Sequence, residues 1–341
     1  MDSKVTVAIL NWNGLRHLQT FLPSVVACSS GAHILVLDNA SDDESIAWIR
    51  QNYAGVEVQI FPENYGFTGG YNRGLKFVKT PYAVLLNSDV EVSEGWIEPL
   101  LQRMESDEKV AACQPKVLSF KDRDHFEYAG AAGGFIDFLG YPFCRGRFFD
   151  FCEKDEGQYQ QAMQVFWATG ACMMVRVSDF FDAGGLETRF FAHMEEIDLC
   201  WRFHHRGKSV WAEPASVVYH LGGGTLQASS PRKTFLNFRN GLSLLYINQV
   251  EGDIYWKLPL RLILDGVAGC RFLLQGDFGN CLAIIRAHFS FYAGIRYWYA
   301  RRRENRKNKT GGIVPGIVYP GSVVYQYFVL KIREFRLLKF W

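Results

Sequence analysis

Several patterns that identify whole classes of protein are missing from this sequence. Its eight cysteines form no CxxC pair, and none lies at zinc-site spacing from other cysteines or histidines. We therefore expect small buried thiols in a reducing compartment rather than disulfides or a zinc site. No G-K-[ST] follows a glycine-rich stretch, and no G-x-G-x-x-G follows the first apolar segment, so a P-loop and a dinucleotide fingerprint are excluded.

Long hydrophobic runs are also missing. Residues 1–4 are polar and the apolar run 5–10 is too short for the core of a signal peptide, so we expect a cytoplasmic protein. Residues 310–330 form the only long uncharged run, but Pro315, Pro320 and four glycines interrupt it. These residues argue against a transmembrane helix and favour a segment that lies on a surface.

What is present is an ordinary globular composition with an uneven charge. The 341 residues, enough for about two domains, are 48% apolar and 21% charged. Residues 232–341 carry 18 Lys and Arg against 6 Asp and Glu, a net charge of +12, which leaves −10 on residues 1–231. We therefore expect an acidic domain, 1–231, that carries the chemistry and a basic region, 232–341, that meets an anionic surface.

The first ninety residues alternate between strand and helix patterns. We expect strands at 5–10, 33–37, 56–61 and 82–86, helices at 14–27, 45–52 and 70–78, and a glycine-rich loop at 62–70. This order is typical of an α/β fold with a mostly parallel sheet covered by helices. The polar clusters 11–13, 38–42 and 87–89 each follow a strand, so they should meet at the sheet edge where such folds bind ligands.

The remaining chain gives fewer signals. Between residues 110 and 177 we expect one strand, 171–177, and further on a helix at 195–206. Residues 232–341 are predicted to be mostly helical, interrupted by the basic cluster 301–309.

Three motifs can carry chemistry, and each also has a structural interpretation. Asp89, at the end of Asn87-Ser88-Asp89, suits a divalent cation, although Asx residues also cap turns. Glu195, Glu196 and Asp198 crowd one helix start, where Asp198 can pair with Arg202 while Glu196 turns toward a cleft as a general base. The alternative is a solvated acidic helix start.

The third motif is His220, which stands between an apolar strand and three glycines. Its ring can bind a metal, but a lone histidine is more often structural. The glycine-rich stretch 63–74 could bring backbone N–H groups to an anion at a helix N-terminus, a weak signal by itself.

In this order, the segments resemble glycosyltransferase family 2, in particular its rhamnosyltransferase-like branch. The resemblance covers about residues 4–225 and rests on VTVAILNWN, VLDNASDD, ENYGFTGGYNRG, LLNSDVEV, ATGACMMVR, GGLETRFFAHMEEIDLCWR and VVYHLGGGT. It implies a GT-A fold, a nucleotide-sugar donor such as a dTDP- or UDP-sugar, a divalent metal (Mg or Mn), and inversion at the anomeric carbon.

The resemblance also assigns roles to residues. It places the nucleoside against Asn11, Trp12, Asn13, Asp38 and Asn39, and the ribose and diphosphate near Asn64, Gly69, Gly70 and Asn72. It matches Asn87, Ser88 and Asp89 to the family's D-x-D, with Asp89 and His220 as metal ligands. It makes Glu196 the catalytic base, with Glu195 as a competitor, and puts Gly170 and Ala171 beside the acceptor.

Two departures from the family pattern stand out. Asn87 replaces the first Asp of D-x-D, as is common in this branch, and leaves fewer charges on the metal. Glu196 stands where Asp is usual and is one methylene longer.

Together these features predict an inverting transfer of rhamnose or another hexose to a saccharide acceptor, lipid-linked, in cell-surface polysaccharide synthesis. A deprotonating carboxylate opposite a metal implies a single displacement. The alternatives are a nucleotidyltransferase of similar fold, which would favour a more basic triphosphate loop, and a non-catalytic binding module, against which Asp89, Glu196 and His220 argue.

The basic region predicts peripheral contact with the inner face of the plasma membrane. Tyr297, Trp298 and Tyr299 precede the basic cluster, a combination suited to anionic headgroups. A helical subdomain or a homodimer interface is the alternative, and no nucleic-acid motif accompanies the cluster.

Overall fold

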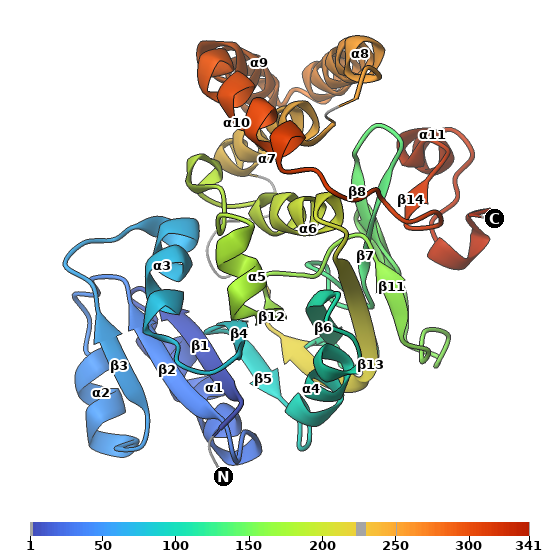
Figure 1. Ribbon diagram of the computed structural model, residues 1–341. Coiled ribbons are helices and arrows are strands. Elements are labelled where there is room, and N and C mark those ends of the chain that lie inside the picture. Colours follow the sequence, from blue (N-terminus) through green and yellow to red (C-terminus); the bar gives the residue numbers. More distant parts are fainter. Residues whose placement is uncertain (1–2, 223–229, 250, 341) are drawn as a thin grey trace.

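The computed structural model describes residues 3–222, 230–249 and 251–340. A nine-stranded sheet forms the body, a smaller five-stranded sheet stands beside it, and the C-terminal helices stack above α6 (Figure 1). Along the larger sheet the strands run β11-β13-β6-β12-β4-β1-β2-β3, and β5 pairs with β13 off this path.

The first half of the body follows the predicted alternation of strands and helices. Its elements are β1 (Val5–Asn11), α1 (Leu15–Cys28), β2 (His33–Asp38), α2 (Ser45–Asn52), β3 (Glu57–Ile60), α3 (Gly66–Gly74), a 3-10 turn (Leu75–Phe77) and β4 (Tyr82–Asn87). All four strands pair in parallel. Alternate β1 side chains enter two separate cores, with Val7 packing toward α1 and Ala8 toward α3, so the sheet is buried on both faces.

The glycine-rich segment differs from its prediction. We predicted a loop over 62–70, but α3 begins at Gly66, about one turn earlier. A Cβ on Gly70 would lie 2.6 Å from Cδ1 of Leu10, and one on Gly74 would lie 2.1 Å from Cδ1 of Leu37. These glycines let the helix backbone pack directly against β1 and β2.

The second half of the body completes the large sheet. It contributes β5 (Val90–Val92), α4 (Ile97–Ser106), β6 (Val110–Ser119), β11 (Met163–Val165), β12 (Cys172–Arg176), α5 (Val177–Asp182), a 3-10 turn (Thr188–Phe190), α6 (Glu195–His205) and β13 (Ser209–His220). Strand β12 runs antiparallel between β4 and β6. The fully buried run of β6 is a strand that the sequence analysis did not identify.

The smaller sheet joins the middle of the chain to its C-terminal part. It consists of β7 (Gly134–Asp137), β8 (Pro142–Cys144), β9 (Arg147–Phe148), β10 (Phe151–Cys152) and β14 (Val318–Tyr319). Strand β14 pairs in parallel with β7, and Phe335 and Phe340 stack on Phe135 with ring centroids 5.0 and 5.2 Å apart. The division at residue 231 stays a prediction.

The C-terminal region is mostly helical, as predicted. Its helices are α7 (Pro231–Asn248), α8 (Ile254–Leu274), α9 (Phe278–Ala293), α10 (Ile295–Lys307) and α11 (Val323–Phe328), followed by a 3-10 turn (Phe335–Leu337). Within the described ranges, no helix has both the length and the apolar character needed to cross a bilayer.

Candidate active site

The polar clusters that follow the first strands meet at one edge of the large sheet, as predicted. In the parallel register Asn11 stands opposite Asp38, and Leu10 opposite Asn87. The amide N–H of Asn87 donates to the carbonyl of Ala171 at 3.0 Å, which brings the start of β12 to the same edge.

Asn11 and Asp38 hold the loop after β2. The side-chain amide of Asn11 donates to Oδ1 of Asp38 at 3.0 Å and to the hydroxyls of Ser41 and Ser45 at 3.1 and 3.0 Å. Asp38 also accepts from the Ser41 hydroxyl at 2.6 Å. Both side chains are buried. The carboxylate of Asp38 is therefore engaged in hydrogen bonds within the protein. Trp12, on the neighbouring loop, is 55% exposed.

Three asparagines predicted to lie near the donor have different surroundings. Buried Asn39 donates to Oδ1 of Asn64 at 2.8 Å and accepts from the backbone N–H of Tyr65 at 2.9 Å. Asn72 donates to the carbonyl of Leu186 and accepts from its N–H, both at 2.8 Å. Asn39 and Asn72 therefore hold the two ends of α3 through hydrogen bonds, while Asn64, just before α3, is exposed.

Asp89 and His220 come together because of strand register. His220 pairs with Val90 in the antiparallel contact of β13 and β5, so its ring reaches the residue before β5. Nε2 of His220 lies 3.1 Å from Oδ1 of Asp89, and Nδ1 lies 3.2 Å from Oε2 of Glu127. All three side chains are buried. Glu127 falls in the stretch where the sequence pattern was weak, and we did not predict it.

The chemistry of two members of this triad, Asp89 and His220, fits a divalent cation. Such cations take carboxylate oxygens and neutral imidazole nitrogens, and Asp89 and His220 supply one of each. Nδ1 of His220 makes no hydrogen bond to any described residue despite its closeness to Glu127. Burial lowers the pKa of His220, but the two carboxylates outweigh burial and raise it to about 10, so a cation would have to displace the ring proton. The described residues contain no preformed cluster of three or more metal-ligating side chains.

Helix α6 presents the candidate base after a strained segment. Phe191, His193 and Met194 all have positive φ, at 67°, 68° and 74°. Such values are uncommon for residues other than glycine and often accompany functional sites. The predicted pair of Asp198 with Arg202 is present at 2.6 Å and is fully buried, which leaves the first turn of the helix to Glu195 and Glu196.

The two glutamates differ in burial and in proton affinity. Glu195 is 5% exposed, whereas Glu196 is only partly buried. Burial and then the charge of Glu196 raise the pKa of Glu195 well above its usual range. Burial raises the pKa of Glu196 to about 7. Ionised Glu196 therefore favours the neutral form of Glu195.

The triad and the candidate base both act electrostatically on Cys144. Burial raises the pKa of the Cys144 thiol, Arg147 opposes that rise, and the charges of Glu127 and Glu196 add to it. Burial and then the charge of Lys233, on α7, lower the pKa of His193, the residue three before Glu196. Burial lowers the pKa of Lys233 itself, and the charge of Glu127 opposes that shift. The sequence analysis missed Cys144 and Lys233, which lie outside the recognised motifs.

Helix α7 also holds the strained segment in place. The side-chain amide of buried Asn240 donates to the carbonyls of Phe190, Ala192 and His193 at 3.0, 2.9 and 2.8 Å. Further along α7, Asn248 donates to Oδ1 of Asp198 at 2.7 Å. The C-terminal region is therefore part of the candidate site's support.

Gly170 and Ala171 lie at the start of β12, beside Asn87 and Ser88. Both are buried, and a Cβ on Gly170 would lie 3.4 Å from Cζ of Phe67 in α3. Gly69 is also buried, with a Cβ position 2.9 Å from that of Tyr65. The acceptor and diphosphate contacts of these residues stay predictions.

Comparison with known proteins places this site in a family. The sequence profile of Glycosyl transferase family 2 matches residues 6–181, about half of the chain. The chain belongs to this family. It is therefore a glycosyltransferase, and the resemblance found in the sequence is confirmed.

Two curated relatives are rhamnosyltransferases. The chain is 25% identical over 291 residues to the N-acetylglucosaminyl-diphospho-decaprenol L-rhamnosyltransferase of Mycobacterium tuberculosis strain H37Rv, covering 80% of this chain and 92% of that protein. It is 25% identical over 228 residues to the rhamnosyltransferase WbbL of Escherichia coli K12, covering 63% of this chain and 83% of that protein.

A solved structure confirms the fold. The mannosyltransferase PcManGT of Pyrobaculum calidifontis, in complex with GDP-Man and Mn2+, superimposes with a TM-score of 0.51 at 13% identity, covering 90% of this chain and 87% of that chain. The predicted GT-A fold with a helical C-terminal region is confirmed.

Proposed function

We propose that this glycosyltransferase moves rhamnose or another hexose from a dTDP- or UDP-sugar to a lipid-linked saccharide acceptor, with inversion, in cell-surface polysaccharide synthesis. The relative from M. tuberculosis supports this proposal, since its name gives a lipid-diphosphate sugar as acceptor and the chain covers 92% of its length. The observation that carries the proposal is the buried Asp89–His220–Glu127 triad where β13 meets β5, together with Glu196 in the first turn of α6.

Glu196 is the proposed base. An acceptor hydroxyl has a pKa far above neutrality, so a carboxylate near the cleft must take its proton as it attacks. Glu196 has a pKa near 7 and partial exposure, which suits this task at neutral pH. Protonated Glu195 then avoids a second buried charge beside it.

Asp89 and His220 are the residues that would hold a divalent metal, Mg or Mn. When bound there, such an ion supplies positive charge that neutralises the leaving diphosphate. Glu127 positions the His220 ring from its other side. Asn87 lies two residues from Asp89 and brings an uncharged amide where a second carboxylate is usual in the family.

The nucleotide is proposed to lie against the loops that follow β1, β2 and β3. Trp12 and Asn64 are exposed there, while Asn11, Asp38, Asn39 and Asn72 fix the loop shapes through internal hydrogen bonds. Attack from the Glu196 side, with the diphosphate leaving toward Asp89, gives a single displacement with inversion.

The proposed location is the inner face of the plasma membrane, where a lipid-linked acceptor is met. The uneven charge of the chain supports peripheral attachment, since residues 232–341 carry the net +12.

The test is nucleotide release from a panel of dTDP- and UDP-sugars by the purified protein, with and without Mn²⁺. Release from one donor, enhanced by a lipid-diphosphate saccharide, supports the proposal, and NMR of the product anomer tests inversion. A nucleotidyltransferase would instead release pyrophosphate from a nucleoside triphosphate and a sugar phosphate. A binding module would release nothing.

A further inference from the structure

Helix α8 has its polar side turned inward. Its five buried residues include Lys257, Arg261 and Asp265, spaced four apart along one stripe. Arg261 donates to the carbonyl of Leu139 at 2.9 Å and lies over the Tyr141 ring at 3.7 Å. Helices on water-soluble proteins normally bury their apolar stripe, so this arrangement reverses the usual pattern.

The inward stripe also joins α8 to α9. Oδ2 of Asp265 lies 3.1 Å from Nε2 of His288 on α9, and Lys257 pairs with Asp253 at 3.3 Å. Internal polar contacts therefore engage the three charged residues of the inward stripe, and the outward side of α8 consists of other residues.

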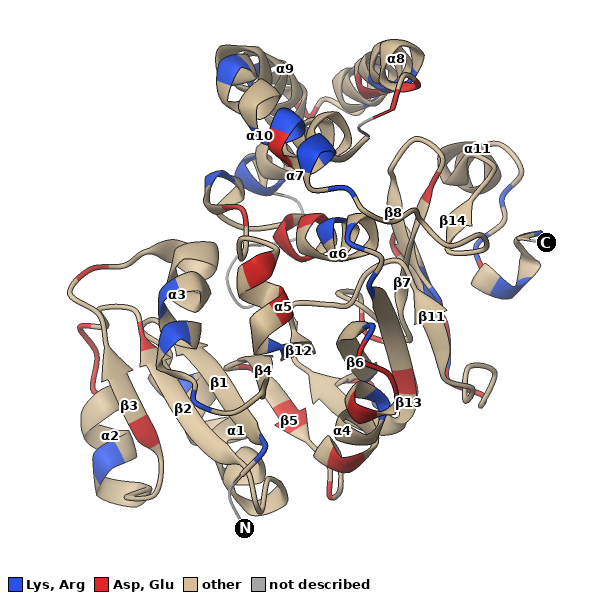
Figure 2. Ribbon diagram, in the orientation of Figure 1, with Lys and Arg blue, Asp and Glu red and all other residues tan. Residues whose placement is uncertain are grey.

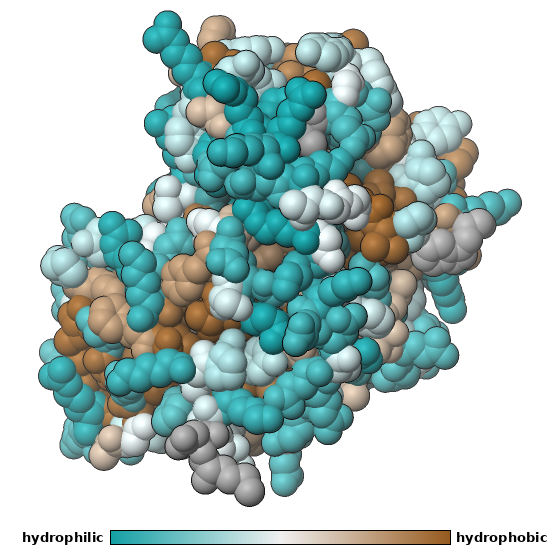
Figure 3. All heavy atoms as spheres, in the orientation of Figure 1, coloured by the Kyte–Doolittle hydropathy of each residue, from teal (hydrophilic) through white to brown (hydrophobic). Residues whose placement is uncertain are grey.

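The outward side of α8 and α9 is apolar. We call it the α8–α9 face and define it by its large exposed side chains: Tyr255, Trp256, Ile263, Val267, Leu273, Leu274, Phe278, Leu282, Ile285, Phe289 and Tyr292. Leu274 is 90% exposed and Phe289 72%. Hydrophobic residues are seen along the upper margin of the space-filling view, where Figure 1 places these two helices (Figure 3). A single exposed leucine is ordinary, but eleven large apolar side chains exposed on two neighbouring helices mark an interaction surface.

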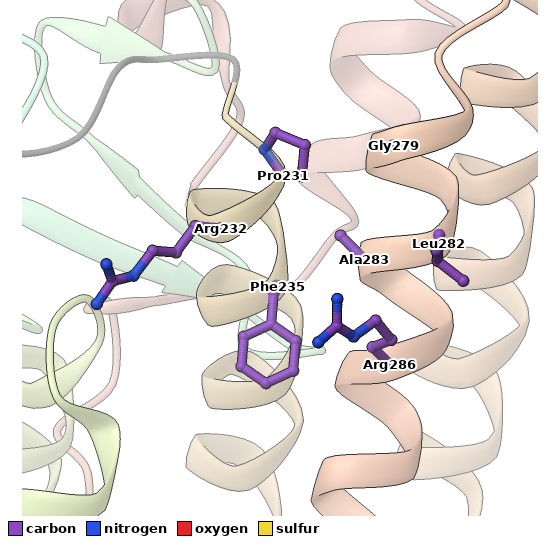
Figure 4. A pocket seen from close by; sticks show the side chains of 7 residues that line it. All are labelled: Pro231, Arg232, Phe235, Gly279, Leu282, Ala283 and Arg286. Carbon is purple, nitrogen blue, oxygen red and sulfur yellow. The ribbon is translucent and has the colours of Figure 1, made fainter.

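Basic side chains adjoin this face. Arg271 and Arg286 are exposed on α8 and α9 themselves. A cavity of about 240 Å³ lies between α7 and α9, lined by Pro231, Arg232, Phe235, Gly279, Leu282, Ala283 and Arg286. The Arg286 side chain points into the space beside Phe235, and Arg232 reaches away from α9 (Figure 4). A charged headgroup could therefore sit beside the apolar side chains.

The same cavity lies next to the catalytic half of the molecule. The Arg232 guanidinium lies 5.4 Å from the centre of the Phe191 ring, at the start of the strained segment before α6. The apolar face and the candidate site thus share one end of α7.

The membrane contact predicted from the sequence covered residues 232–341 and rested partly on residues 297–309, several of which make internal contacts in the structure. Trp298 is buried, and both Tyr297 and Arg301 bond to Glu187, at 2.6 and 2.9 Å. Arg302 donates to the backbone carbonyls of Tyr246, in the last turn of α7, and of Gln249 and Glu251, which follow α7. In Figure 2 the basic residues of α10 lie above the acidic residues of α6 and its preceding loop. Much of this cluster therefore holds the protein together.

We propose that the α8–α9 face seats in the headgroup and upper acyl region of a bilayer that carries anionic lipid. Lipid is favoured over a second copy of the chain because exposed Arg271 and Arg286 border the apolar side chains, and anionic headgroups would complement them whereas the same arginines of a second copy would not. This inference rests on the proposed function and deepens it. Binding of this face to a membrane would bring a lipid-linked acceptor to the candidate site beside Phe191.

The test is flotation of the full chain with vesicles of phosphatidylcholine alone and with 30% phosphatidylglycerol added. Ile263→Gln and Phe289→Gln should each weaken binding to the anionic vesicles by about tenfold, the scale of one large buried apolar side chain. Arg286→Gln should reduce the preference for the anionic vesicles. Phe77→Gln, an exposed apolar residue of the nucleotide half, is the matched control and should change nothing.

Two results would overturn this inference. One is unchanged flotation of the double variant Ile263→Gln/Phe289→Gln. The other is a wild-type dimer, seen by light scattering without vesicles, that the double variant converts to a monomer. Donor hydrolysis without vesicles separates the membrane-binding proposal from the proposed function. The double variant should hydrolyse the donor as fast as the wild type. Lack of hydrolysis in both proteins would count against the proposed function alone.

Discussion

The first ninety residues and helix α8 of the C-terminal region obey opposite rules of polarity. In β1, β2 and β4 the apolar side chains point inward and polar groups collect at the strand ends, so Asn11, Asp38 and Asn87 meet at one edge. In α8 the charged stripe points inward and the apolar side chains point outward. Polar groups at the strand ends therefore mark a ligand-binding edge in the first region, whereas outward apolar side chains mark an interaction surface on α8.

The comparison also shows that the two regions are not independent. Asn240 and Lys233 of α7 act on the segment before α6 and on Glu127, so the C-terminal region helps to shape the candidate site. The following predictions test whether the reacting side chains lie in the body and whether the C-terminal helices hold them in position.

The largest effect is expected at the candidate base. Glu196→Gln should lower turnover by ~10²-fold or more, the usual scale for loss of a general base, while donor binding stays intact. Glu195→Gln should be milder, since burial and the charge of Glu196 raise the pKa of Glu195 and favour its neutral form. Single-turnover kinetics on both variants provide the measurement. A reversed order of the two effects would transfer the role of base to Glu195.

A comparable loss is expected at the proposed metal site. Asp89→Asn should reduce Mn²⁺-supported turnover by roughly 10²-fold, because it removes the carboxylate that is proposed to hold the metal ion. Thermal unfolding should show a folded protein. Glu91→Gln, on the adjacent β5, serves as control and should keep wild-type metal dependence. Wild-type turnover in Asp89→Asn would dismiss Asp89 as a ligand.

These two predictions rest on residues that can be found from the sequence, because each lies at the end of a strand or at the start of a helix with a clear pattern. The predicted strand 82–86 puts Asp89 just beyond a strand end, and the four-residue spacing on the helix correctly predicts the pair of Asp198 with Arg202. Glu127 and Cys144 belong to the stretch around the small sheet, whose short strands give little periodic signal. The inward stripe of α8 was missed for another reason: composition records that a region is basic and apolar but not which residues face out.

A smaller effect is expected at a positioning residue of α7. Asn240→Ala would leave the carbonyls of Phe190, Ala192 and His193 without their shared donor, and should lower kcat by about tenfold to thirtyfold with little change in donor KM. Asn237→Ala, one helical turn earlier, is the matched control. Partial rescue by Asn240→Gln would show that the amide matters, whereas equal effects at 237 and 240 would indicate general destabilisation of α7.

The smallest effect is expected from pH, and it separates catalysis from stability. Burial raises the pKa of Glu196 to about 7, so the ionised, base-competent fraction should rise about tenfold between pH 6 and pH 8. Turnover should follow that rise. Stability should move the other way: the folded protein binds this proton more tightly than the unfolded chain, so the contribution of Glu196 is complete below its ordinary pKa and is lost as pH rises through 7. Parallel measurements of turnover and thermal midpoint, on the wild type and on Glu196→Gln, check both signs. In the variant the midpoint should lose this part of its pH dependence, and a wild-type rate that falls from pH 6 to 8 would be incompatible with Glu196 as the base.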